Sequence, residues 1–61
     1  MSVGEWVRIR RLEYAREALL DGRRSISDVA LAAGFADQSH LTRLFRGHFG
    51  VTPAEYRRGL S

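Results

Sequence analysis

The stretch between Gly34 and Gly50 limits most strongly what this chain can fold into. Asp37 is a good helix N-cap, because its short side chain can accept hydrogen bonds from the free N–H groups of a first turn. At the i, i+3, i+4 and i+7 spacing of a helix, the apolar side after it consists of Leu41, Leu44, Phe45 and His48, with Phe49 beside them. The stretch therefore predicts one amphipathic helix that is packed through this side.

The opposite side of the same helix is polar and contains no carboxylate. It carries Ser39 and Arg43, flanked by His40, Thr42 and Arg46. The major groove of a duplex admits one α-helix, and guanidinium groups match base edges there. The pattern favours DNA recognition, and the alternative is that this is only the polar outer side that any surface helix has.

Residues 25–33 predict a short helix just before that one. Ser25 can cap it, and Asp28 follows three residues later, as in a capping box with a shorter acid. Its apolar side is expected to be Ile26, Val29, Ala30 and Ala33. Gly34 then ends it, because glycine is favoured in the left-handed conformation after a helix, and Phe35 is expected to fill the gap between the helices. This is a helix-turn-helix pattern, in which the second helix enters the major groove, although a tight helix pair that binds nothing remains the alternative.

Residues 5–21 predict a long helix that Gly22 closes, because they are rich in strong helix formers and lack glycine and proline. Its main apolar stripe is expected to be Ile9, Leu12, Ala15, Leu19 and Leu20. A second apolar group lies on another side and comprises Val7, Tyr14 and Ala18, with Trp6 between the two. A helix with two apolar sides needs two partners, and the chain downstream supplies one. We therefore expect the second side to pack on a unit outside this chain; the alternative is that it is simply exposed, since single apolar surface residues are common.

A last short helix is expected over residues 53–58. Thr52 would be its N-cap, Pro53 its first residue and Glu55 the acid of a capping box. The expected fold is all-α: a small helical domain with one helix-turn-helix, preceded by a long helix and followed by a short one. The whole chain, residues 1–61, is expected to be a single domain.

Composition restricts the function further. The net charge is +3 and the sequence pI is near 10.6, with ten arginines and no lysine. A basic balance supports nucleic-acid binding, although GC-rich coding is the first explanation for the missing lysine. No apolar run approaches the roughly 18 residues that cross a membrane, and the N-terminus does not read as a secretion signal. We expect a cytoplasmic protein without membrane contact.

The sequence supplies no chemistry for catalysis or metal binding. It contains no cysteine, and its two histidines stand eight residues apart without further ligand clusters, so we expect neither a metal site nor another cofactor. Neither histidine has the carboxylate, serine or thiol partner that nucleophilic catalysis needs. We expect the protein not to be an enzyme.

From about Ile26 to Arg58 the residues read IxDVAxxxGFxDQSHLTRxFRxxFGVTPxxYR. This motif resembles the DNA-binding region of AraC-type transcriptional regulators, and the preceding RRLEYAREALL resembles the connecting helix of that family. Members usually carry two helix-turn-helix units joined by one long helix. The resemblance implies that residues 5–21 are the connecting helix and residues 25–58 the second unit, and that the spare apolar side contacts the first unit in the family.

The resemblance also implies which residues meet DNA. Gln38, Ser39, Thr42 and Arg43 match positions that face bases or the groove, with Arg43 suited to guanine O6 and N7 and Gln38 to adenine. Arg46 is expected to hold a phosphate, which positions the protein without specifying sequence.

Two further polar residues complete the predicted site. Ser25 could meet a phosphate at the start of the short helix, where free N–H groups point outward. His40 either touches the DNA backbone or a base edge, or hydrogen-bonds within the first turns and holds the turn, and a mixed structural role is favoured. His48 is taken as structural. The predicted DNA-binding set is Ser25, Gln38, Ser39, His40, Thr42, Arg43 and Arg46.

The expected function is that of a sequence-specific DNA-binding module of a bacterial transcription regulator, acting on double-stranded promoter DNA. The family resemblance implies activation through contact with RNA polymerase, and a missing first helix-turn-helix unit or a second copy of the chain as further partners. The alternative is a truncated helical fragment that dimerises through Trp6, Val7 and Tyr14 and does not bind DNA independently.

Overall fold

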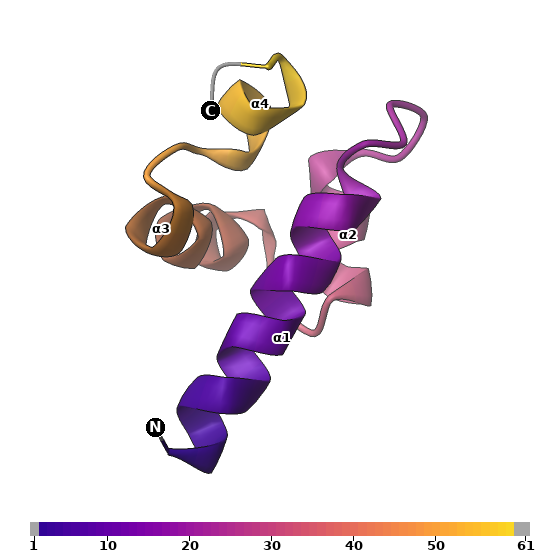
Figure 1. Ribbon diagram of the computed structural model, residues 1–61. Coiled ribbons are helices and arrows are strands. Elements are labelled where there is room, and N and C mark those ends of the chain that lie inside the picture. Colours follow the sequence, from indigo (N-terminus) through magenta and orange to yellow (C-terminus); the bar gives the residue numbers. More distant parts are fainter. Residues whose placement is uncertain (1, 60–61) are drawn as a thin grey trace.

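The computed structural model describes residues 2–59, and within them it contains helices but no strands. The four helices are α1 (Val3–Ala18), α2 (Ile26–Ala32), α3 (Gln38–Phe49) and α4 (Pro53–Arg57). In Figure 1, α1 is the long rod, α2 and α3 follow as the helix pair, and α4 lies beside α3. The all-α prediction is confirmed, with one long helix before the helix pair and one short helix after it.

The predicted bounds of the first helix, residues 5–21, are wrong at both ends. α1 begins at Val3, because the Ser2 hydroxyl accepts a hydrogen bond from the Glu5 N–H at 3.1 Å and caps the first turn. A glycine in that turn does not prevent this. At the other end, Leu19 is the C-cap, and the chain leaves the helix through tight i to i−3 hydrogen bonds before it reaches Gly22.

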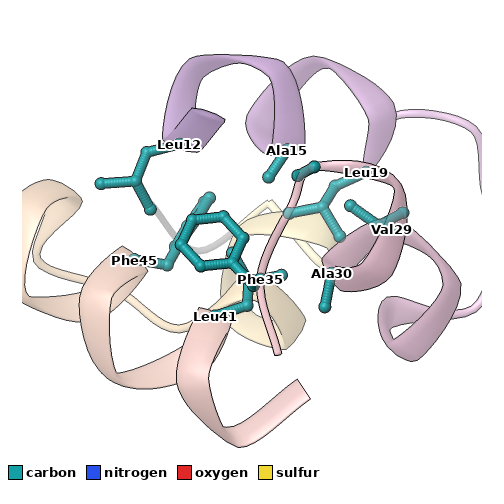
Figure 2. Close-up of a cluster of buried hydrophobic side chains, with 9 residues drawn as sticks. Leu12, Ala15, Leu19, Val29, Ala30, Phe35, Leu41 and Phe45 are labelled. Carbon is teal, nitrogen blue, oxygen red and sulfur yellow. The ribbon is translucent and has the colours of Figure 1, made fainter. Parts of the chain in front are cut away.

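The core joins three of the helices and the turn between α2 and α3. Figure 2 shows its side chains converging from α1, α2 and α3. The buried hydrophobic residues are Leu12, Ala15, Leu19, Val29, Ala30, Ala33, Phe35, Leu41 and Phe45. Ala15 and Ala30 are fully buried, and their small side chains let the helices approach closely.

Two predictions about α1 need correction. Leu20, expected in the core stripe, is 66% exposed, because the helix has already ended and the chain turns away from the core. Ala18, assigned to the spare apolar side, packs against the core instead. Trp6 and Tyr14 do remain exposed, at 56% and 48%. The spare side is therefore narrower than the sequence suggested.

The two glycine turns that frame α3 are as predicted. Gly34 has φ +93° and Gly50 has φ +83°, in the left-handed region where a side chain would be strained. α4 has its capping box, with Thr52 and Glu55 bonded reciprocally at 3.1 and 2.9 Å, but it ends at Arg57, one residue earlier than expected. Gly50 is thus the left-handed C-cap at which α3 stops, and Asp37 is the N-cap at which it starts.

Candidate nucleic-acid interface

Packing decides which side of α3 is free. Leu41 and Phe45 are completely buried, and the Phe45 ring contacts those of Phe49 and Tyr56 with centroid distances of 4.6 and 5.9 Å. Asp37 begins the helix by accepting a hydrogen bond from the His40 N–H at 2.8 Å. Because both ends and the inner side are held, the rotation of α3 about its axis is determined, and its outer side points to solvent.

The outer side of α3 is slightly hollowed. The residues that line this hollow are Gln38, Ser39, Thr42, Arg43, Arg46 and Gly47. The side chains of Arg43 and Arg46 are exposed, and the ion pairs found within residues 2–59 involve other arginines. The structure thus brings five of the seven predicted DNA-binding residues together on one surface that has no acidic member.

Gly47 belongs to this surface and was missed by the sequence analysis. It lies one turn after Arg43, and a Cβ at this position would meet no atom within 4 Å. The bare backbone leaves space beside the Arg43 side chain. A glycine inside an otherwise helical pattern, on the polar side, was the signal available in the sequence.

His40 lies outside the hollow and is half-buried. Its Nδ1 accepts a hydrogen bond from the Ala36 N–H at 3.2 Å, and its ring meets the Phe35 ring edge-on at 5.3 Å. A ring nitrogen that accepts carries no proton, so the neutral ring has its proton on Nε2. The structural reading of His40, that it holds the turn, is what the geometry shows.

Ser25 and His48 lie elsewhere. The Ser25 hydroxyl caps α2 by accepting a hydrogen bond from the Asp28 N–H at 3.0 Å, and it does not line the hollow on α3. His48, expected on the apolar side, is exposed and only leans edge-on against Phe49 at 4.7 Å. That expectation is wrong, because Leu41 and Phe45 set the direction of the core and leave His48 at its edge.

One carboxylate influences Arg46 from α4. The pKa of Glu55 is lowered, first by the hydrogen bond from the Thr52 backbone N–H and its bond with the Thr52 side chain, and further by the charges of Arg46 and Arg58. The Glu55 carboxylate offsets part of the positive charge near Arg46. Because it accepts the hydrogen bond from the Thr52 N–H, it does not cover the Arg46 guanidinium.

None of the helices within residues 2–59 is long and apolar enough to span a bilayer. The same residues contain no group of three or more potential metal ligands among histidines and carboxylates.

Comparison with known proteins gives a consistent result. The family model of the helix-turn-helix domain matches residues 1–59. The virulence regulon transcriptional activator VirF of Yersinia enterocolitica is 46% identical over 57 residues, which are 93% of this chain and 21% of that protein. The transcriptional regulator ExsA of Pseudomonas aeruginosa is 44% identical over 59 residues, 97% of this chain and 21% of that protein. No solved structure gives a significant match.

A shorter relative is covered more fully. The regulatory protein SoxS of Salmonella typhimurium is 39% identical over 59 residues, which are 97% of this chain and 55% of that protein. The chain thus spans about a fifth of the first two relatives and about half of the third. Together with the helix pair and the exposed, acid-free side of α3, the family match over nearly the whole chain identifies it: the chain belongs to the AraC-type helix-turn-helix family, the DNA-binding module of bacterial transcription regulators.

Proposed function

We propose that the chain binds promoter DNA by placing α3 in the major groove. The observation that carries this proposal is the outer side of α3, where exposed polar and guanidinium groups gather without a carboxylate. An α-helix with side chains is about 10–12 Å across, which suits the roughly 12 Å width of the major groove. Leu41 and Phe45, turned inward, keep the opposite side toward the groove.

The residues of this side divide between specificity and positioning. Arg43 reads guanine through O6 and N7, and Gln38 reads adenine, because these side chains can form paired hydrogen bonds with those base edges. Ser39 and Thr42 offer hydroxyls to neighbouring base edges, and Arg46 binds a phosphate.

The two remaining predicted contacts have lesser roles. His40 positions the turn before α3 and touches the DNA backbone from the flank of the helix. Ser25 approaches a phosphate from the start of α2 while it caps that helix.

We propose that residues 1–61 are one part of a larger regulator. Residues 5–21 are its connecting helix, and residues 25–58 are its second helix-turn-helix unit. The exposed Trp6 and Tyr14 on α1 support a further contact, with a first helix-turn-helix unit or a second copy of the chain. RNA polymerase is the partner through which DNA binding would alter transcription. The role is binding rather than catalysis, and its place is the cytoplasm.

The test is a fluorescence titration of the chain on a duplex selected by the chain from random sequences, and on a scrambled duplex, across a range of salt concentrations. Arg43→Ala should reduce the preference for the selected duplex by about 1–3 kcal/mol, the usual worth of a paired base contact. The control is Arg10→Ala, which removes an arginine of α1 that pairs with Glu13 at 3.9 Å. Equal preference in the Arg43→Ala chain and the unmutated chain would contradict the proposal.

A further inference from the structure

A second groove lies between α1 and α3. α1 contributes one stripe to it, at i, i+3, i+4 and i+7 spacing: Gly4, Val7, Arg8 and Arg11. The opposite wall is the flank of α3 with His40 and Leu44, and Phe35 of the turn completes the lining. The groove is therefore apolar inside and carries two guanidinium groups along one edge.

Both arginines of the groove are exposed, and nothing negative lines it. Within residues 2–59 the ion pairs join Arg10 to Glu13 and Arg23 to Asp21, so Arg8 and Arg11 are not among the paired arginines. Glu5 stands one turn before Arg8 but forms no ion pair with it. Two unpaired cations three residues apart lie on one side of a helix and present their charge to the same partner.

Arg11 also lies against the turn between α2 and α3. A Cβ on Gly34 would lie 3.0 Å from its Nε and 3.3 Å from its Cζ, so the guanidinium rests directly over the backbone of this glycine. The turn requires a glycine at position 34 because φ is positive there. The missing side chain of Gly34 also leaves room for the Arg11 side chain. The Arg11 side chain therefore lies beside the turn that leads into α3.

The groove borders the surface proposed to enter DNA. His40 and Leu44 lie on the flank of α3, and Arg43 lies next to Leu44 on the outer side. A helix fills the width of the major groove, so its flanks face the phosphates along the groove walls. Charges on α1 beside one flank are then close to the backbone of the strand on that side.

We propose that Arg8 and Arg11 form a phosphate clamp: together they bind the DNA backbone beside the major groove that α3 occupies. The inference rests on the proposed function and adds a second element, α1, to the DNA contact. Its ligand is a pair of phosphodiesters, because two guanidiniums without protein carboxylates match two anions, and backbone contacts require no particular bases. An apolar protein segment in the interior would leave both charges without partners.

The experiment measures the affinity of the 61-residue chain for a short duplex of scrambled sequence and for the selected duplex at several salt concentrations. Each neutralised phosphate contributes about −0.9 to the slope of log K against log salt concentration. Arg8→Ala with Arg11→Ala should make the slope less steep by about 1.8 and weaken binding roughly tenfold at low salt on both duplexes. Arg10→Ala, on the same helix but paired with Glu13, is the matched control and should leave the slope unchanged.

A second variant guards against loss of folding. Because Arg11 rests over Gly34, its removal could disturb the turn, so Arg8→Ala alone is measured as well and should reduce the slope by about 0.9. Arg8→Lys with Arg11→Lys keeps both charges and should restore the slope. Circular dichroism confirms the helix content of each variant.

The outcomes separate this inference from the proposed function. If Arg43→Ala loses sequence preference while the Arg8→Ala chain keeps the unmutated slope, α3 reads DNA and the clamp is overturned. If the clamp variants reduce the slope but Arg43→Ala changes nothing, α1 contacts the backbone and the base-reading proposal fails. If the clamp variants reduce self-association in sedimentation and leave the slope alone, the groove belongs to a protein partner and the clamp is overturned.

Discussion

Arg57 joins α4 to the C-terminal end of α1. Its Nε donates a hydrogen bond to the Leu19 carbonyl at 2.9 Å and its Nη2 donates one to the Asp21 carbonyl at 3.2 Å. These carbonyls follow the last turn of α1, where helix carbonyls lack internal partners. A guanidinium is a suitable group here, because it supplies several donors in one plane and its charge complements a helix C-terminus. The arginine of α4 thereby fixes the end of α1.

We predict that Arg57→Ala lowers the free energy of unfolding by about 1–2 kcal/mol, because two charge-assisted hydrogen bonds are lost from a half-buried site. Arg58→Ala is the matched control: it removes the neighbouring exposed arginine and should change stability by no more than about 0.5 kcal/mol. Urea unfolding followed by circular dichroism measures both. Equal effects of the two substitutions would show that Arg57 acts only through its charge.

Among the helices, α4 depends most on its surroundings, because a helix of five residues could not persist in isolation. Its N-terminus is held by the reciprocal bonds of Thr52 and Glu55, and its buried Pro53 suits the first helical position. The same capping box lowers the pKa of Glu55 below its ordinary value of 4.5. A carboxylate whose pKa is lowered by folding stabilises the native state above its ordinary pKa, and this contribution is lost as the pH falls through the lowered value.

We therefore expect Glu55→Gln to make stability less sensitive to acid. The amide can still accept the hydrogen bond from Thr52, but it does not titrate. The drop in melting temperature between neutral pH and about pH 3 should be smaller for this variant than for the unmutated chain. Asp21, whose pKa is lowered first by its side-chain hydrogen bond from Arg23, still contributes a drop of the same sign. Glu17→Ala, which removes an exposed carboxylate of α1, should leave the drop as it is. If the melting temperature of the Glu55→Gln chain fell as far as that of the unmutated chain, Glu55 would not be a source of the acid sensitivity.

At the scale of the whole molecule, the main constraint is size. A domain of 61 residues buries only about 60% of its unfolded surface and is expected to have about 3–9 kcal/mol of stability in total. Its buried hydrophobic residues form one cluster, so each large side chain contributes a substantial part of the free energy of unfolding. Phe45 is the largest of the fully buried ones, and it packs against Phe49 of α3 and Tyr56 of α4.

Phe45→Ala should lower the free energy of unfolding by about 3–5 kcal/mol, a large part of the total, because the cavity cannot be refilled in so small a core. Leu31→Ala is the comparison, since that leucine of α2 is 59% exposed and its truncation should cost little. Thermal unfolding by circular dichroism distinguishes them. A cooperative transition of unchanged midpoint in the Phe45→Ala chain would rule out the single-core description.

The sequence alone determined the local structure: the caps at Ser25, Asp37 and Thr52 and the left-handed glycines that end α2 and α3 all depend on neighbours within one or two turns. Such short-range interactions are read from spacing. Tertiary structure alone decided where α1 ends, that His48 lies outside the core, and that Arg8 and Arg11 line a groove with α3. These features depend on contacts between segments far apart in the chain, which helical periodicity within one segment does not specify.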